Sequence, residues 1–309
     1  MKKLLVIGSL NMDFVTHVPH PLAVGETMLA QDLQLVPGGK GANQAYAMGK
    51  LGGRAAMLGA VGADLHGDRL LENLRSVGVE VAAIQREQDA PTGMAVITVL
   101  PDGDNSILVL PGANSQVTPE VLEEHSQLLE ECDILVLQLE IPLETVVAAA
   151  VKAAQLGKQV ILDPAPAVPG LPEELLKSLW LIKPNETELS ILTGRPYAPE
   201  HLREDAQSLQ KRGVKNVLVT LGAAGSYLLK EDGTESFFPA DDSVKVVDTT
   251  AAGDSYVAAL AVALSRGESL EAAARFASRV SDVVVTRPGA QTSIPSPEEL
   301  EALGDSSHG

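Results

Sequence analysis

Most of the chain alternates between short apolar runs and longer segments with helical periodicity. The apolar runs consist almost entirely of Leu, Val, Ile and Ala, and polar residues do not occupy every second position. Strands of a parallel sheet that is covered by helices on both faces have this pattern. The strands predicted in this way are residues 4–7, 56–61, 134–139, 159–162, 179–182 and 217–221.

Helical patterns lie between these strands. They span residues 42–51, 120–130, 143–156 and 201–211, and several are followed by a glycine such as Gly213, as a C-cap would be. A regular succession of strand, helix and strand produces right-handed crossovers between parallel strands. We therefore predict a three-layer α/β/α fold around a doubly wound, mostly parallel sheet.

Two stretches do not follow this alternation. Residues 14–36 lack a helical period, and residues 94–100 and 106–110 flank residues 101–105, a turn sequence that contains Asp, Gly and Asn. Such a turn between two apolar runs is typical of a β-hairpin. We predict that these segments form a small antiparallel sheet that stands off the main sheet as a lid.

The C-terminal part of the chain has its own series of elements. We predict a second hairpin at 226–230 and 235–238, a last strand at 244–247, and helices at 253–265 and 269–285. Neither a repeat nor a long linker divides the chain. We predict a single domain over residues 1–297 with lid segments at about 14–37 and 93–111, and a C-terminal tail over residues 298–309, in which residues 304–309 lack fixed structure.

The composition disfavours several classes of partner. Hydrophobic residues make up 45% of the 309 residues but aromatic residues only 3%, so the core is aliphatic and platforms for stacking nucleic-acid bases are scarce. The net charge of −18 repels phosphodiester backbones and anionic lipids. We expect small-molecule ligands rather than nucleic acid or a membrane. A local group of backbone N–H donors can still bind a nucleotide in an acidic protein.

The single cysteine, Cys132, excludes an intrachain disulfide, which is typical of a reducing compartment. The apolar stretch 134–151 contains Glu140 and Pro142 and is unsuited to crossing a bilayer. The N-terminal apolar run, residues 4–10, is better explained as a first strand than as a signal peptide. We expect a soluble, cytoplasmic protein.

The sequence DTTAAGD at residues 248–254 lies between a predicted strand and an alanine-rich helix. The small residues Ala251, Ala252 and Gly253 let a ligand approach the backbone, and the first N–H groups of a helix have no intrahelical acceptor, which makes an anion hole. Asp254 lies at its rim, where a carboxylate is suited to take the proton of an attacking hydroxyl. The alternative is an ordinary acidic residue in the first helical turn. In both cases the helix terminus is expected to favour the ionised carboxylate.

A glycine-rich turn, GGKGANQ at residues 38–44, opens the first predicted helix. It is not a P-loop, because Gly41 follows Lys40 where Ser or Thr is required. Lys40 and Asn43 suit the hydroxyl groups of a sugar. The alternative for Lys40 is a solvated lysine in a turn.

Further polar residues follow the predicted strands, at the carboxyl ends where open α/β sheets bind ligands. Asn11 and Asp13 follow the first strand and are two residues apart, so they point the same way, which suits a vicinal diol. An ordinary Asx turn is the alternative. Glu140 follows the apolar strand 134–139.

Two more segments of this kind come later in the chain. Asn185 begins a predicted helix with Glu188 in its first turn, so this segment either holds hydrated Mg²⁺ or caps the helix. Thr220, Gly222 and Gly225 form a second glycine-containing turn, whose backbone N–H groups can bind phosphate or ribose. The concentration of polar loops at strand ends indicates a ligand site.

These residues together resemble the PfkB carbohydrate kinase family, in its ribokinase-like form, over residues 1–297. Residues 38–45 resemble the first family signature and residues 248–254 the second, with Ala251 where other members have Gly. Other segments match in order and spacing: Asn11 and Asp13, then residues 138–140, 184–188, 220–222 and 286–293.

The resemblance implies an enzyme that transfers a phosphoryl group from ATP to the 5-hydroxymethyl group of D-ribose, giving D-ribose 5-phosphate and ADP. It also implies a homodimer that pairs through the lid. The sugar contacts implied are Asn11, Asp13, Gly39, Lys40, Asn43 and Glu140, with Asp254 as the catalytic base beside Ala251, Ala252 and Gly253. The ATP contacts implied are Asn185, Thr220, Gly222, Gly225, Gly253 and Ser278. An activating K⁺ would be surrounded by Asp248, Thr250, Val284, Arg287, Gly289 and Ser293, and Mg²⁺ would lie near Glu188.

Two alternatives stay open. A related kinase of deoxyribose, fructose or a nucleoside would keep the same machinery, although Asn11, Asp13 and the complete run 38–43 favour ribose. A non-catalytic member that binds a nucleoside is the other alternative, and the intact Asp254 argues against it. Ser278, with Arg279 and Asp282 on the same helix, departs from the family pattern and leaves the nucleotide preference open.

Overall fold

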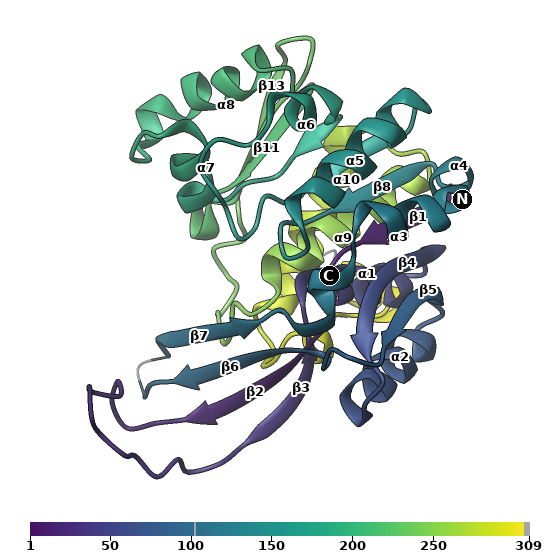
Figure 1. Cartoon of the computed structure of the whole chain (residues 1–309). Coiled ribbons are helices and arrows are strands. Elements are labelled where there is room, and N and C mark those ends of the chain that lie inside the picture. The colour runs from purple at the N-terminus through teal and green to yellow at the C-terminus, as the bar shows by residue number, and fades with distance from the viewer. Residues whose placement is uncertain (102, 306–309) are drawn as a thin grey trace.

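Strand β1 (Leu4–Ile7) lies inside the large sheet, and its side chains explain the layers of the fold. All four residues are buried: Leu4 and Val6 pack in one hydrophobic cluster, and Leu5 and Ile7 pack in another. Because successive side chains of a strand point to opposite faces, each face of the sheet needs its own layer of helices. The computed structural model, which describes residues 1–101 and 103–305, has both layers (Figure 1).

The large sheet has nine strands in the order β13-β12-β11-β10-β9-β8-β1-β4-β5. All pairs from β5 to β11 are parallel, and β12 and β13 add to one edge in antiparallel pairs. Their bounds are β4 (Ala55–Gly62), β5 (Glu80–Glu87), β8 (Ile134–Leu137), β9 (Gln159–Leu162), β10 (Leu181–Ile182), β11 (Asn216–Thr220), β12 (Ser226–Leu229) and β13 (Glu235–Phe238). The predicted doubly wound, mostly parallel sheet is confirmed.

Helices cover both faces of this sheet. The cluster that contains Leu4 and Val6 is completed by α1 (Lys40–Lys50), α2 (Leu65–Ser76), α9 (Ala252–Ser265), α10 (Leu270–Val284) and α11 (Pro297–Asp305). The opposite cluster is completed by α3 (Pro119–Glu124), α4 (Ser126–Glu131), α5 (Leu143–Gln155), α6 (Glu173–Ser178), α7 (Glu186–Thr193) and α8 (Leu202–Lys211). The three-layer α/β/α prediction is therefore confirmed.

Helix α9 is apolar on all sides because it lies between the sheet and other helices. Every residue from Asp254 to Ser265 is buried, and α9 packs against both α1 and α10. A helix enclosed in this way needs no polar face. It has 14 residues, and no helix in the described part of the chain is long and apolar enough to cross a membrane.

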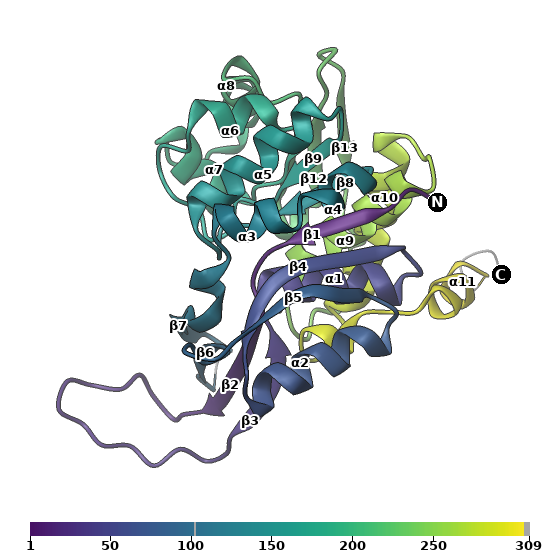
Figure 2. The ribbon, with the colours of Figure 1, turned by 45° about the vertical axis from the view of Figure 1, so that its right-hand side comes forward.

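A smaller sheet projects from one end of the large sheet and forms the lid (Figures 1 and 2). Its strands are β2 (Asn11–His17), β3 (Gln34–Gly38), β6 (Gly93–Val99) and β7 (Asn105–Leu110), in the order β3-β2-β6-β7. The lid segments are those predicted, but the sheet is not fully antiparallel, because β2 and β6 run parallel. Asp102, in the predicted β6–β7 turn, lies outside the described residues.

Several boundaries differ from the prediction. The predicted strand 244–247 does not form: Val246 and Val247 are 59% and 58% exposed, and the N–H of Val247 donates to the Val285 carbonyl at 2.7 Å instead of pairing with edge strand β13. The predicted helix 120–130 is interrupted at His125. Helix α2 and edge strand β5 were not predicted.

The predicted C-terminal tail is helical through Asp305, as part of α11, and Leu300 packs in the core. The prediction that residues 304–309 lack fixed structure is wrong for 304 and 305. Residues 306–309 lie outside the described part of the chain.

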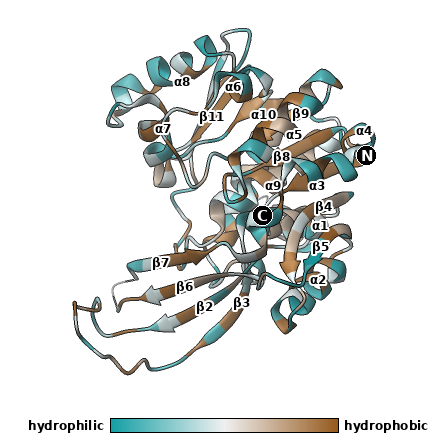
Figure 3. Ribbon diagram, in the orientation of Figure 1, coloured by the Kyte–Doolittle hydropathy of each residue, from teal (hydrophilic) through white to brown (hydrophobic). Residues whose placement is uncertain are grey.

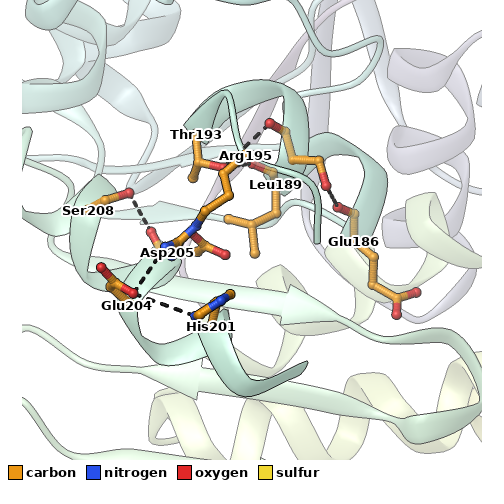
Figure 4. Close-up of polar contacts among 9 residues, drawn as sticks. Glu186, Leu189, Thr193, Arg195, His201, Glu204, Asp205 and Ser208 are labelled. Carbon is orange, nitrogen blue, oxygen red and sulfur yellow. Dashed lines mark hydrogen bonds and ion pairs between the residues drawn. The ribbon is translucent and has the colours of Figure 1, made fainter. Parts of the chain in front are cut away.

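A buried ion pair fastens α7 to α8 (Figure 4). Asp205 in α8 is 2% exposed, and its Oδ1 accepts a hydrogen bond of 2.9 Å from Arg195 Nε in the loop after α7. The same guanidinium reaches Glu204, whose side chain is exposed. Since Asn185 and Glu188 stand at the opposite end of α7, this pair helps to fix the helix that presents them to the site.

Arg195→Ala is expected to lower the melting temperature by several degrees, because it leaves the buried carboxylate of Asp205 without its partner. Asp205→Ala should cost less, since the arginine that remains is 35% exposed and still pairs with Glu204. Glu204→Ala removes an exposed partner of the same arginine and is the matched control, with a small change expected. Thermal unfolding of the three variants checks this, and equal losses for Arg195→Ala and Glu204→Ala would contradict it.

Candidate active site

The polar residues that follow the parallel strands lie along one edge of the large sheet. Strands β1, β8, β9, β10 and β11 are parallel neighbours, so the segments after them leave from the same edge. The chain order reverses at β1, with β4 and β5 on one side and β8 to β11 on the other. An open α/β sheet has its ligand crevice at such a point. Asn11, Glu140, Asn185 and Thr220 all leave from this edge.

The turn before α1 requires glycine at position 39. Gly39 has a φ of 86°, in the left-handed region, and a Cβ there would lie 2.7 Å from the backbone nitrogen of Asn11. This close packing places the start of α1, with Lys40 and Asn43, beside the start of lid strand β2. The lid residues Asn11 and Asp13 therefore meet α1 at the crevice.

Asp254 lies in the first turn of α9 and is 6% exposed. Both of its carboxylate oxygens accept hydrogen bonds from α1: Asn43 Nδ2 donates to Oδ2 at 3.0 Å, and Gln44 Nε2 donates to Oδ1 at 3.1 Å. The carboxylate is thus fixed in one orientation. Gln44 was not predicted as a site residue, although it is adjacent to Asn43 in the same motif.

The pKa of Asp254 is raised, mainly because the carboxyl group is buried. The Lys40 ammonium and the hydrogen bonds from Asn43 and Gln44 oppose this effect, while the Asp163 carboxylate adds to it. The expectation that the helix terminus favours the ionised form stays a prediction, and burial acts against it. The ionised state depends on the neighbouring side chains.

Lys40 supplies positive charge on the α1 side of Asp254. Burial lowers the pKa of its ammonium group, but four carboxylates, those of Asp254, Asp163, Glu140 and Glu188, together raise it above the ordinary value. Lys40 is therefore charged and surrounded by acids, which excludes the alternative of a solvated turn lysine.

Asp163 and Lys183 form a buried ion pair that the sequence prediction missed. Lys183 Nζ lies 3.2 Å from Asp163 Oδ1, and a Cβ at Gly253 would lie 3.2 Å from the same nitrogen. The ammonium group is thus beside the start of α9. Asp163 follows strand β9 directly and Lys183 follows β10 directly. A position shortly after a predicted strand indicated Asp13 and Glu140 as site residues, and the same pattern could have indicated this pair.

On the lid side, Asn11 and Asp13 are two residues apart on β2, so their side chains point to the same face. Asn11 Oδ1 accepts a 2.8 Å hydrogen bond from Asn114 Nδ2, which orients its amide. Burial, together with the carboxylates of Glu140 and Asp254, raises the pKa of Asp13 to about 7. Three carboxyl groups therefore converge where the sugar site was predicted.

Glu140 is held by the residues around it. Its Oε2 accepts hydrogen bonds from Ser9 Oγ at 2.5 Å and from the backbone N–H of Lys40 at 3.0 Å. Ser9 and Asn114 were not predicted, because each acts by holding a predicted residue in place rather than through a pattern of its own.

A cavity of about 710 Å³ extends from Lys40 and Asp254 to α10. Its walls include the predicted residues Ala251, Ala252, Gly253, Asn185, Glu188, Thr220, Gly222, Gly225 and Ser278, together with Asp163 and Lys183. This volume is typical of small-molecule sites. The structure therefore brings the predicted nucleotide contacts and Asp254 into one cavity.

Ala251 ends the loop before α9 in a strained conformation. It has a φ of 57° and is the one non-glycine residue with positive φ in residues 1–101 and 103–305. For a residue with a Cβ, this left-handed backbone conformation is less stable than the right-handed one by roughly 1–2 kcal/mol. The strain lies where the first N–H groups of α9 meet the cavity, which is a common location for strain at functional sites.

Asn185 and Glu188 form a capping box at the start of α7. Asn185 Oδ1 accepts from the Glu188 N–H, and Glu188 Oε2 accepts from the Asn185 N–H, both at 2.8 Å. Capping is thus the observed role, although Glu188 also lines the cavity and burial raises its pKa. Within the described residues no group of three or more His, Cys, Asp or Glu side chains is placed to hold a metal ion. Mg²⁺ near Glu188 stays a prediction.

Asp248 joins the two loops predicted to surround a monovalent cation. Its Oδ1 accepts from the Thr250 N–H at 2.8 Å, and its Oδ2 accepts from the Gly289 N–H at 2.8 Å. These hydrogen bonds lower the pKa of Asp248 despite its partial burial. Val284 ends α10, which leads into the second loop.

The other two residues of this group have partners of their own. Ser293 Oγ donates to the Ala290 carbonyl at 2.6 Å. The Arg287 side chain pairs with Glu299 at 3.0 Å, so it turns toward α11 rather than toward Asp248. A contribution of Arg287 to a cation site would have to come from its backbone.

The arrangement suits the transfer of an anionic group to a hydroxyl. A fixed carboxylate can accept the hydroxyl proton, while two ammonium groups and a helix N-terminus can neutralise charge on the transferred group. The predicted sugar contacts Asn11 and Asp13 lie on the lid, and Asp254 also lines the cavity that contains the predicted nucleotide contacts.

Comparisons with known proteins agree with this chemistry. Residues 1–297 match the description pfkB family carbohydrate kinase. The chain is 38% identical to the ribokinase of Haemophilus influenzae, with 98% of each chain covered, and 37% identical to the deoxyribokinase of Salmonella typhi, with 96% of each covered. The structure of Arabidopsis thaliana ribokinase complexed with ribose and ATP is similar, with a TM-score of 0.92, 36% identity and 98% of each chain covered.

The titration of Asp13 is expected to appear in the stability of the protein. Because its folded-state pKa of about 7 lies above the ordinary value, the folded protein holds a proton between about pH 4 and 7 that the unfolded chain has released. The free energy of unfolding therefore falls as the pH rises through this window, insofar as Asp13 controls it. In Asp13→Asn this contribution is absent.

Denaturant unfolding of Asp13→Asn and the parent at about pH 5 and about pH 8 measures this contribution. The variant should gain stability relative to the parent as the pH rises. A difference that does not change with pH would show that Asp13 is ionised throughout.

Proposed function

The chain belongs to the pfkB family of carbohydrate kinases, and on this basis we propose that it transfers the terminal phosphoryl group of ATP to the 5-hydroxymethyl group of D-ribose. The products are D-ribose 5-phosphate and ADP. That the protein is a phosphotransferase with an alcohol group as acceptor follows from the family and from its relatives. The proposal that ATP and ribose are the substrates rests on the position of Asp254. On one side of it are the lid residues Asn11 and Asp13, and on the other is the cavity that contains Lys183 and the start of α9.

In the proposed mechanism, Asp254 accepts the proton of the sugar hydroxyl as the oxygen bonds to phosphorus. The hydroxyl becomes acidic as this bond forms, so a carboxylate is a sufficient acceptor. The N–H groups of Ala252 and Gly253 donate to the transferred group. Lys183, beside the start of α9, and Lys40 offset its negative charge.

The sugar is held from the lid side and from α1. Asn11 and Asp13 point to the same face of β2, and Glu140 and Asn43 border the same space. Carboxylates and amides that are already fixed by Ser9, Asn114 and the Lys40 N–H lose little freedom when they bind hydroxyls. Gly39 lets the backbone approach the sugar, and Lys40 adds a cation.

The nucleotide occupies the cavity. The residues that would hold it are Asn185, Thr220, Gly222, Gly225, Gly253 and Ser278, all of which line the cavity. The similar Arabidopsis structure contains ribose and ATP, which supports this assignment. Mg²⁺ would accompany the phosphates near Glu188 and offset their charge, since Mg²⁺ commonly needs only one or two protein carboxylates.

A related sugar is the alternative substrate. The relatives include a deoxyribokinase with nearly the same identity as the ribokinase, so overall similarity does not decide between the two sugars. Asn11 and Asp13 together favour a sugar with two adjacent hydroxyl groups, as ribose has. A non-catalytic nucleoside-binding protein is disfavoured by the fixed carboxylate of Asp254.

A coupled assay of ADP formation with ribose, deoxyribose, fructose and adenosine tests the proposal. Ribose is expected to give the highest kcat/KM, and Asp13→Ala to lower it by about tenfold to a hundredfold through a lost buried hydrogen bond, with the KM for ATP nearly unchanged. A preference for another acceptor would replace ribose as the substrate. An equal loss of ATP affinity would contradict the placement of Asp13.

Asp254→Asn keeps the shape of the side chain and removes the proton acceptor. The kcat is expected to fall by about 10²–10⁴-fold, with ribose and ATP binding largely preserved. Turnover and melting temperature are measured on the same preparation. A kcat close to that of the parent, with a lowered melting temperature, would identify Asp254 as a structural residue.

We propose that K⁺ activates the enzyme from the loops joined by Asp248. Asp248, Thr250 and Gly289 are already connected by hydrogen bonds, and Val284 and Ser293 lie at the ends of the same segment. A bound ion would fix the loop that leads to Ala251. Activity should therefore fall when K⁺ is replaced by Na⁺ at constant ionic strength, and equal rates after desalting would exclude a functional site.

We propose further that the protein is a cytoplasmic homodimer that pairs through the lid. Exposed apolar residues lie on β7, at Ile107, Leu108, Val109 and Leu110, on β6 at Val96, and in the segment between β2 and β3, at Leu22, Val24, Leu29 and Leu33. Figure 3 shows the apolar colouring of β7. Phe14, by contrast, is partly buried and meets the ring of His66 edge-on. A second lid would cover β7, which is also an open strand edge. Sedimentation that shows only monomers at micromolar concentration would exclude this dimer.

A further inference from the structure

Two series of hydrogen-bonded side-chain amides, called amide chains below, end on the two oxygens of Asp254. The first amide chain begins at Asn73 in α2, whose Nδ2 donates to Gln291 Oε1 at 2.5 Å. Gln291 Nε2 donates to Asn43 Oδ1 at 2.9 Å, and Asn43 Nδ2 donates to Asp254 Oδ2 at 3.0 Å. Three successive amides thus connect α2, the loop after α10, α1 and α9.

The second chain reaches the other oxygen through the core of the sheet. Gln138, which follows β8, donates from Nε2 to Gln44 Oε1 at 2.6 Å. Gln44 Nε2 then donates to Asp254 Oδ1 at 3.1 Å and also to Asp163 Oδ2 at 2.9 Å. Gln44 and Gln138 are both fully buried, so water does not compete for these hydrogen bonds.

The chemistry of the groups fixes the direction of both chains. An ionised carboxylate only accepts hydrogen bonds, so Asn43 and Gln44 must turn their NH₂ groups toward Asp254. Their oxygens then face away and need donors, which Gln291 and Gln138 supply. Every amide in the two chains therefore donates toward Asp254, and hydrogen bonds in such a series polarise one another.

Burial is the largest influence on the carboxyl group of Asp254, and it favours the neutral form. Lys40 from α1 stabilises the ionised form, whereas Asp163 after β9 opposes it, as does Asp13 on β2, whose carboxyl group interacts with that of Asp254. Lys183 after β10 is paired with Asp163, and Glu140 and Glu188 act on Lys40. The hydrogen bonds from Asn43 and Gln44 add to Lys40 and to the start of α9 in stabilising the charged form.

We propose that Gln138, Gln291 and Asn73 are positioning residues that act through Gln44 and Asn43 to keep Asp254 ionised and correctly oriented. The inference rests on the proposed function, in which Asp254 accepts the hydroxyl proton. None of these three residues bonds to Asp254 directly. Each donates to the oxygen of the next side-chain amide, so that the NH₂ group of that amide points toward Asp254. Loss of Gln138 or Gln291 leaves the amide oxygen of Gln44 or Asn43 without its donor, which loosens the orientation of that amide and weakens the hydrogen bond that stabilises the charged form.

The test uses Gln138→Met and Gln291→Met, which keep the length of the side chain and remove the amide. Asn216→Leu is the matched control, because Asn216 is also a buried amide but bonds to the Trp180 carbonyl and the Glu231 N–H, remote from Asp254. The pH profile of kcat/KM is measured for each full-length enzyme. The pKa of Asp254 is followed separately by carboxyl ¹³C NMR, with its signal identified by comparison with Asp254→Asn.

Each glutamine variant is expected to move the acid limb of the profile, and the NMR titration, upward by about one pH unit. The kcat/KM should then fall by about tenfold below the limb and stay near the parent value at alkaline pH, whereas the control should show no shift even if its melting temperature falls. An unmoved limb in both glutamine variants, or a loss that is uniform across pH, would overturn the proposal. If instead the parent phosphorylates no sugar, the proposed function fails, and the NMR titration still decides whether the amide chains set the pKa of Asp254.

Discussion

Burying the ionised carboxylate of Asp254 costs several kcal/mol, and the architecture around the crevice is arranged to offset that cost. The carboxylate stands at the start of a helix that is enclosed on all sides, so water solvates it very little. Lys40 comes from α1, and the amides of Asn43 and Gln44 come from the same helix. Because α1 and α9 pack directly against each other, a change in their contact would alter the proton acceptor as well as the fold.

The same constraint explains the shape of the neighbouring site. Acidic groups gather on the lid side, at Asp13 and Glu140. The cavity holds the ammonium groups of Lys40 and Lys183, but acidic side chains outnumber them in its lining. A polyphosphate in the cavity would therefore depend on these two lysines and on backbone N–H groups rather than on a generally positive surface.

Much of this could be predicted from the sequence, because strand ends are marked by local patterns. Asp13, Glu140, Asn185 and Thr220 were all indicated by their positions after apolar runs. The amides of Gln138, Gln291 and Asn73 were not, because they act only when segments far apart in the chain pack together, and no local period reports that. The false strand at 244–247 has a related cause: a valine-rich run predicts a strand, but the sequence does not report that the backbone of Val247 bonds to the end of α10, far along the chain.

The parallel pairing of β2 with β6 gives the two halves of the crevice different origins. Asn11 and Asp13, the proposed sugar contacts, belong to a small sheet with its own hydrogen-bond ladder, whereas Asp254 and the cavity belong to the large sheet and its helices. If these residues bind the sugar as proposed, acceptor preference can change through substitutions on the lid while the residues around Asp254 stay the same. A protein built in this way can acquire a new sugar substrate during evolution without first losing phosphoryl transfer.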